Sequence, residues 1–133
     1  LGTEILPGVM ELIHAFRQYS IPIALVSASP RRIMDAALSG IPGNIFDFTI
    51  SSDDVTQTKP NPEPYLSAAE KAGVDIREAL VIEDSKTGIA SASAAGAYVL
   101  AIPHFISIEP SQRIKIASTL EGLTPADIYG LFS

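Results

Sequence analysis

The sequence contains no cysteine. The chain therefore has no disulfide bonds, no thiol nucleophile and no thiolate ligands for a zinc site. A chain without thiols is compatible with the reducing cytoplasm, and we expect a cytoplasmic location on this ground.

Positive charge is also scarce, because 9 Lys and Arg residues stand against 15 Asp and Glu, for a formal net charge of −6. A negative field repels polyanions, and the basic residues are scattered except for Arg31 and Arg32. We therefore expect no nucleic-acid partner.

Long apolar runs are missing as well. The longest, such as 21–26 and 97–102, are far shorter than the roughly 20 residues that cross a bilayer, so we expect no membrane partner. The 133 residues are 47% hydrophobic and 18% charged, which is typical of a folded, water-soluble protein of one domain.

Short apolar segments alternate with segments of helical character along the chain. Strands are predicted at 21–26, 48–50, 79–82 and 98–102, the first of them buried on both faces. Helices are predicted at 8–19, 30–39, 63–72, 86–95, 112–117 and 125–132. Short connections between alternating elements imply right-handed crossovers. The sequence thus predicts an α/β fold with a three-layer, doubly wound, mainly parallel sheet.

Polar residues follow several predicted strands at the point where each strand ends. Ser27 follows the first strong strand, Lys59 comes after the weak strand at 48–50, and Glu83 and Asp84 follow the strand at 79–82. Ligands of open parallel sheets bind at the carboxyl ends of the strands, so these side chains are candidates for one site.

A hydroxyl, an ammonium and two carboxylates at one sheet edge can bind phosphate together with a divalent metal. A serine hydroxyl and the following backbone N–H groups hold phosphoryl oxygens, and a lysine neutralises their charge. Carboxylate oxygens suit Mg²⁺, which takes one or two protein carboxylates. The pattern indicates a small phosphorylated ligand and a Mg²⁺ cofactor.

Each of these residues also has a simpler structural explanation. Glu83 and Asp84 lie where a helix begins, so helix-dipole stabilisation or capping by Asp84 or Ser85 accounts for acidic residues there. Ser27 taken alone can simply end a strand, and Lys59 taken alone can be a solvated cation in a proline-rich loop.

Other polar residues are assigned to the surface. His14 and His104 are interpreted as surface residues, and Asp53 and Asp54 as a solvated turn, although the two aspartates could instead support Lys59. One predicted helix has a buried stripe of three residues: Tyr65, Leu66 and Ala69.

The ordered set of segments resembles the haloacid dehalogenase-like hydrolases. Residues 23–29 resemble the family's second motif, 51–65 its third motif with the lysine, and 81–97 its fourth motif with the helix behind it. The resemblance covers roughly residues 6–103. It is nearest to the subgroup that contains beta-phosphoglucomutase and small sugar-phosphate phosphatases.

The resemblance implies a phosphatase or phosphomutase acting on a small phosphorylated metabolite, such as a sugar phosphate, through an aspartyl-phosphate intermediate. Ser27 and the Ala28 amide would hold the phosphate, and Lys59 would be catalytic by stabilising its charge. Asp84, with Glu83, would bind Mg²⁺. Many relatives carry two aspartates in place of Glu83 and Asp84, so direct and water-mediated roles for Glu83 both stay open.

The family's first motif, Asp-x-Asp-x-Thr after an apolar strand, does not occur in these residues. We therefore expect 1–133 to be a single partial core domain with motifs two to four. The nucleophile, the general acid/base aspartate and the cap would lie in an N-terminal part, in agreement with a chain that starts at Leu1. The chain alone is expected to be inactive.

The strand that carries the first motif would lie between the strand ending before Ser27 and the one ending before Asp84. Its loss would expose two inner strand edges. We predict that an N-terminal fragment, a segment of another copy of the chain, or a rearranged sheet fills this gap. Direct hydrogen bonding between the two strands would favour rearrangement.

Two other functions compete with the phosphotransferase. Response-regulator receiver domains use a similar set of residues, but they place the acidic pair first and the lysine last, the reverse of this chain. The remaining alternative is a noncatalytic binding or regulatory module derived from a haloacid dehalogenase-like phosphatase. A module of this kind would also lack the nucleophilic aspartate.

Overall fold

The structure, a computed structural model, describes residues 7–41, 45–103 and 107–133. Its elements are, in order, α1 (Val9–Arg17), β1 (Ala24–Val26), α2 (Arg31–Leu38), β2 (Phe48–Ile50), η1 (Ser52–Asp54), α3 (Glu63–Ala72), η2 (Ile76–Glu78), β3 (Leu80–Glu83), α4 (Lys86–Ala95), β4 (Tyr98–Ala101), β5 (Ile114–Ile116) and α5 (Pro125–Phe132). Every strand pair is parallel, which confirms the predicted α/β fold.

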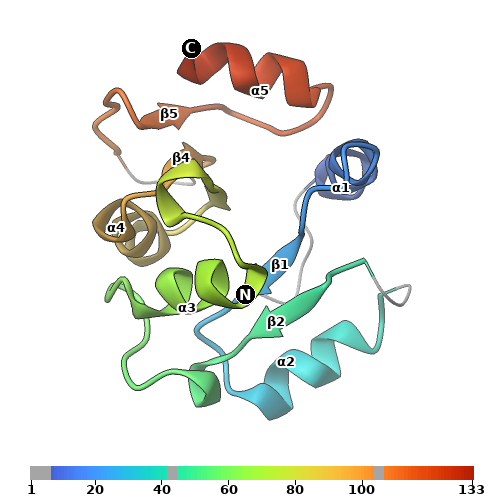
Figure 1. Ribbon diagram of the computed structural model, residues 1–133, viewed down its shortest axis with the longest axis vertical. Coiled ribbons are helices and arrows are strands. Elements are labelled where there is room, and N and C mark those ends of the chain that lie inside the picture. Colours follow the sequence, from blue (N-terminus) through green and yellow to red (C-terminus); the bar gives the residue numbers. More distant parts are fainter. Residues whose placement is uncertain (1–6, 42–44, 104–106) are drawn as a thin grey trace.

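The parallel strands form two separate sheets (Figure 1). β1 pairs with β2, while β3, β4 and β5 form the second sheet in that order. In the described part of the chain no ladder joins β1 to β3. The direct pairing that would have favoured a rearranged sheet is thus not observed, and what fills the gap between the two strands stays a prediction.

The larger sheet is covered by helices on both faces, because successive side chains of a strand point to opposite sides. Val81, Val99 and Ala101 pack with residues of α3 and α4 in one buried cluster. Leu100 and Ile102 pack with residues of α1 and α5 in the other. These three layers agree with the predicted architecture.

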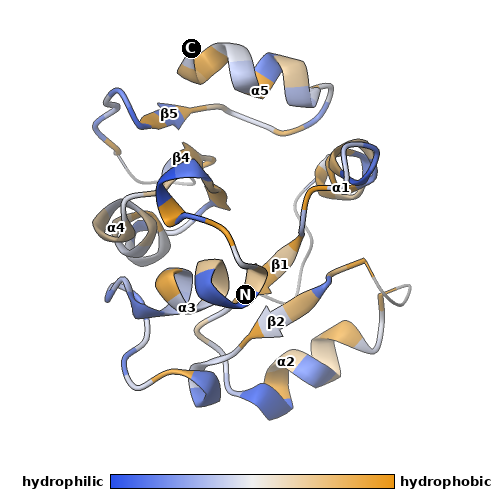
Figure 2. Ribbon diagram, viewed as in Figure 1, coloured by the Kyte–Doolittle hydropathy of each residue, from blue (hydrophilic) through white to orange (hydrophobic). Residues whose placement is uncertain are grey.

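The smaller sheet is less well covered. Figure 2 shows β1 and β2 in mostly apolar colours, yet all three residues of β1 are only half-buried. The prediction that 21–26 is a strand buried on both faces is thus wrong, because among the described residues β1 pairs only with β2 and lies at the edge of a two-stranded sheet, where less of each face is covered. The helix α3 contacts β1, β2 and α4, so it connects the two sheets.

Two further predictions need correction. The segment 112–117 contains the strand β5 in place of a helix, because the branched Ile114 and Ile116 extend the larger sheet beside β4. Leu66 is 43% exposed while Tyr65 and Ala69 are each 7% exposed, because residues four apart share a helix face and Leu66 lies off it. None of the described helices is long and apolar enough to cross a membrane.

Candidate active site

Ser27 lies directly after β1, where its backbone N–H still donates to the Ile50 carbonyl at 2.9 Å. Its hydroxyl oxygen accepts a hydrogen bond from the Ser29 N–H at 3.0 Å, which folds the chain away from the strand. Among the described residues the Ala28 N–H has no hydrogen-bond partner. The loop therefore offers a hydroxyl and a free backbone donor at the end of β1.

Lys59 connects the ends of the two sheets. Its side chain is 9% exposed, and its Nζ donates to the carbonyl of Val26, the last residue of β1, at 3.0 Å. The same Nζ forms an ion pair with Oε2 of Glu83, the last residue of β3. The solvated-cation explanation of Lys59 is therefore wrong.

Glu83 is buried, and its carboxylate has partners on both oxygens. Besides Lys59, the Tyr65 hydroxyl donates to Oε2, and the Ser85 hydroxyl donates to Oε1 at 3.4 Å. Gly88 leaves the space that this carboxylate occupies, because a Cβ on Gly88 would overlap it. Burial, and next the charge of Glu83, raise the pKa of Tyr65 well above its usual value, so Tyr65 stays a protonated donor.

Asp84 differs from its neighbour. Within the described ranges its half-buried carboxylate takes part in no hydrogen bond or ion pair. Ser85 caps α4 by accepting a hydrogen bond from the Gly88 N–H at 3.1 Å, so the capping explanation holds for Ser85 and not for Asp84.

The donor set at the end of β3 fits a hard divalent cation through Asp84, whose oxygens are unengaged. Glu83 gives its carboxylate to Lys59 and Tyr65, so its role as a direct metal ligand stays a prediction. No group of three or more His, Asp or Glu side chains suited to a metal occurs among the residues described. A cation held by Asp84 would need further ligands from elsewhere.

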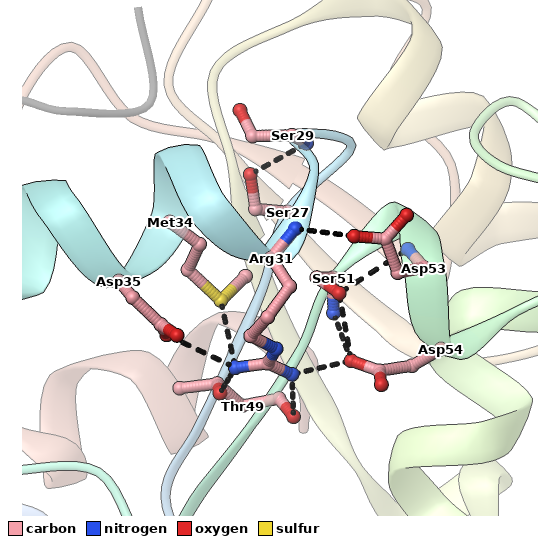
Figure 3. A network of polar contacts seen from close by, with 9 residues as sticks. All are labelled: Ser27, Ser29, Arg31, Met34, Asp35, Thr49, Ser51, Asp53 and Asp54. Atoms are coloured by element: carbon pink, nitrogen blue, oxygen red, sulfur yellow. Dashed lines mark hydrogen bonds and ion pairs between the residues drawn. The ribbon is translucent and has the colours of Figure 1, made fainter.

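A second polar network lies beside the Ser27 loop and is centred on Arg31 (Figure 3). The guanidinium of Arg31 donates to the Thr49 hydroxyl at 2.5 Å and to the Thr49 carbonyl at 3.2 Å. It also forms ion pairs with Asp54 and, at 3.5 Å, with Asp35. This network ties the start of α2, just after the Ser27 loop, to the end of β2.

Asp53 and Asp54 belong to this second network and do not contact Lys59. Asp53 accepts a hydrogen bond from the Arg31 backbone N–H at 2.8 Å, and Asp54 accepts from the Ser51 N–H at 2.7 Å. The backbone and hydroxyl hydrogen bonds from Ser51, together with Arg31, lower the pKa of Asp54 to about 2. Asp53 and Asp54, predicted to form a solvated turn, are exposed but hydrogen-bonded, and they belong to the capped helix η1.

One of the two histidines can be placed in the described structure. His14 is exposed on α1, as predicted. His104 falls outside the described residues.

With this geometry in place, comparison with known proteins identifies the family. The family model of the haloacid dehalogenase-like hydrolases matches residues 1–96. The chain belongs to this family. The resemblance seen in motifs two to four is thereby confirmed, including its nearness to beta-phosphoglucomutase-like members. The family comprises phosphatases and phosphomutases and is generally Mg²⁺-dependent.

Among haloacid dehalogenase-like relatives, the validoxylamine A 7′-phosphate phosphatase of Streptomyces hygroscopicus subsp. limoneus is 34% identical over 96 residues, covering 71% of this chain and 45% of that protein. The structure of CbbY from Rhodobacter sphaeroides with phosphate superposes with a TM-score of 0.82 at 25% identity, covering 93% of this chain and 58% of CbbY. The beta-phosphoglucomutase of Clostridium difficile shares the fold, with a TM-score of 0.82 at 21% identity over 98% of this chain and 57% of its own. The chain spans 45% of the length of the validoxylamine A 7′-phosphate phosphatase and of Protein CbbY of Rhodobacter capsulatus, and 26% of the bifunctional riboflavin kinase/FMN phosphatase of Arabidopsis thaliana.

Sequence reasoning did not assign a site role to Tyr65, Gly88 or Arg31. Tyr65 reads as a core residue because its spacing in α3 is that of an apolar stripe. Gly88 reads as an ordinary helical glycine, and only the position of the Glu83 carboxylate reveals the space it provides.

Proposed function

We propose that this chain is part of a Mg²⁺-dependent phosphotransferase, a phosphatase or phosphomutase acting on a small phosphorylated metabolite such as a sugar phosphate. One observation carries the proposal: the Lys59 ammonium joins the carboxyl ends of β1 and β3, beside Ser27 and Asp84. A phosphorylated substrate is supported by the relative named as a validoxylamine A 7′-phosphate phosphatase.

The nucleophile in this proposal comes from outside the 133 residues. Within residues 7–41, 45–103 and 107–133, β1 and β3 each have one edge without a strand partner, and Lys59 connects their ends. An extended segment between them would satisfy backbone groups on both edges and place its own carboxyl end beside Lys59. We propose that an N-terminal segment of the same polypeptide, or of another copy, supplies this strand and the nucleophilic aspartate.

The chemistry divides into two steps. The aspartate oxygen attacks phosphorus, and the bond from phosphorus to the substrate oxygen breaks, with a proton passing from the general acid/base aspartate of the N-terminal part to the leaving alkoxide. Water or a sugar hydroxyl then attacks the same phosphorus and gives its proton to that aspartate, and the aspartyl carboxylate leaves. The Ser27 hydroxyl and the Ala28 N–H hold the phosphoryl oxygens, and Lys59 stabilises their negative charge.

Asp84 is the residue of this chain that would hold Mg²⁺ directly. When bound, the cation screens the repulsion between an anionic nucleophile and an anionic phosphate. Glu83 would be the second carboxylate, acting directly or through water from Oε1, because Oε2 pairs with Lys59 and Tyr65.

The test is turnover of an aryl phosphate by the gene product that carries these residues, with Mg²⁺ and with EDTA. We expect Mg²⁺-dependent release of phosphate, and we expect Asp84→Asn to lower kcat by roughly 100-fold. Asp75→Asn is the matched control, because Asp75 is exposed, caps η2 through the Arg77 N–H and lies outside the proposed site.

Phosphate binding without turnover by the whole gene product would contradict the enzymatic proposal and favour the noncatalytic module. Activity of the isolated 133 residues would contradict the proposed origin of the nucleophile. Activity that appears only when the preceding segment is present, in one chain or as two fragments, would support it.

A further inference from the structure

The Tyr65 hydroxyl and the Lys59 ammonium meet on the same oxygen of Glu83, Oε2. Tyr65 and Glu83 are each 7% exposed, so neither group exchanges its partner for water at low cost. The Lys59 ammonium also lies 5.1 Å from the centre of the Tyr65 ring. A single buried carboxylate is thus fixed by one charged and one neutral donor.

The position of this carboxylate decides where Lys59 points. Of the three ammonium donors, one goes to the Val26 carbonyl and one to Glu83, which leaves one for a phosphoryl oxygen. If the carboxylate turned, the ammonium would follow it away from the end of β1. Gly88 gives the carboxylate its space on the α4 side, and Tyr65 holds it from the α3 side.

We propose that Tyr65 is a positioning residue, whose hydroxyl fixes Glu83 and thereby keeps the Lys59 ammonium directed at the phosphate site. The proposal rests on the proposed function, because it assumes that Lys59 serves a phosphoryl group. The contact itself is independent of that function and can be tested separately.

The first experiment measures the reactivity of Lys59 by competitive acetylation of the whole gene product, with the exposed Lys71 as internal reference. We expect Tyr65→Phe, which removes only the hydroxyl, to raise the acetylation rate of Lys59 at least threefold relative to Lys71. Tyr98→Phe is the matched control, since Tyr98 begins β4, at the strand end opposite Glu83, and its ring contacts Phe132 at 5.1 Å and the Arg113 guanidinium at 3.8 Å. It should leave the ratio unchanged.

A second variant keeps the test decisive if Tyr65→Phe folds poorly. Glu83→Gln should also raise the acetylation of Lys59, and adding Tyr65→Phe to it should cause no further increase, because Tyr65 acts through Glu83. An unchanged Lys59 rate in a folded Tyr65→Phe protein would overturn the proposal, as would fully additive effects of the two substitutions.

The second experiment measures turnover. We expect Tyr65→Phe to lower kcat about tenfold while KM changes less than twofold. A misdirected ammonium stabilises the transition state less, and it has little effect on how tightly the substrate is bound. An equal rise in KM with kcat unchanged would overturn the positioning role. A wild-type gene product without any turnover would instead contradict the proposed function, and the acetylation ratios would still decide whether Tyr65 directs Lys59.

Discussion

The two ion-pair networks at the strand ends differ chiefly in burial. Lys59 and Glu83 have side chains that are 9% and 8% exposed, whereas Arg31 and Asp54 are 34% and 39% exposed. A buried charge that loses its partner costs several kcal/mol, while an exposed pair contributes about 1 kcal/mol or less. The number of hydrogen bonds alone would rank the Arg31 network higher, so burial is the better guide to which network the fold depends on.

Lys59→Met should have the largest effect, because it leaves the Glu83 charge buried without a cation. We expect the free energy of unfolding to fall by about 3 to 5 kcal/mol, measured by urea denaturation of the gene product. Lys71→Met, at an exposed lysine whose ammonium lies 5.3 Å from the centre of the Phe48 ring, should change it by less than about 1 kcal/mol. A loss below about 1 kcal/mol for Lys59→Met would mean that Tyr65 and Ser85 satisfy Glu83 unaided.

Gly88→Ala should rank second, because the added methyl group displaces the Glu83 carboxylate from its partners. We expect a loss of about 2 to 4 kcal/mol in the same measurement. Gly130→Ala is the control: this helical glycine of α5 has open space around its Cβ position, so alanine should be neutral or stabilise by up to about 1 kcal/mol. Equal losses of stability in Gly88→Ala and Gly130→Ala would contradict the argument that a methyl group at position 88 displaces the Glu83 carboxylate.

Arg31→Met should have a smaller effect, since its partners regain water when the guanidinium is removed. We expect a loss of about 1 kcal/mol in the free energy of unfolding. Arg32→Met, at the exposed neighbouring position, should change stability by less than about 0.5 kcal/mol. A loss as large as that of Lys59→Met would break the comparison between the two networks.

Asp54→Asn should show the smallest effect, and only in a defined pH range. The pKa of Asp54 is lowered from 3.8 to about 2, so its stabilising contribution is present above pH 4 and is lost as pH falls through 2. Because this carboxylate is largely exposed, we expect that contribution to be about 1 kcal/mol or less. We would measure the urea midpoints of both proteins at pH 6, 4 and 2. The midpoint of Asp54→Asn should fall less on acidification than that of wild type. An equal fall in both proteins would contradict a stabilising role of the ionised Asp54.

The sequence predicted most elements because local signals and tertiary packing agree in them. Gly73 and Gly96, both with positive φ, end α3 and α4 where the sequence indicated. β5 was missed because three residues carry too little periodicity, and only its pairing with β4 makes them a strand.

The candidate site was predictable in part, since strand order alone brings residues at strand ends to one edge. That rule grouped Ser27, Lys59 and Asp84 without any knowledge of distances. It could not reveal that the Tyr65 hydroxyl and the Lys59 ammonium contact the same oxygen of Glu83. The position of a tyrosine in an apolar stripe does not show which group its hydroxyl binds.

The sequence by itself determined the α/β fold class, the order of most strands along the chain and the set of candidate site residues, because these depend on local periodicity and on motifs within short segments. Only the tertiary structure decided that, among the described residues, β1 and β3 lie in separate sheets, Lys59 connects the two, and Glu83 holds Lys59 while Asp84 has no hydrogen-bond or ion-pair partner. The physical reason is that burial and pairing of charges depend on segments far apart in the chain, which no local pattern records.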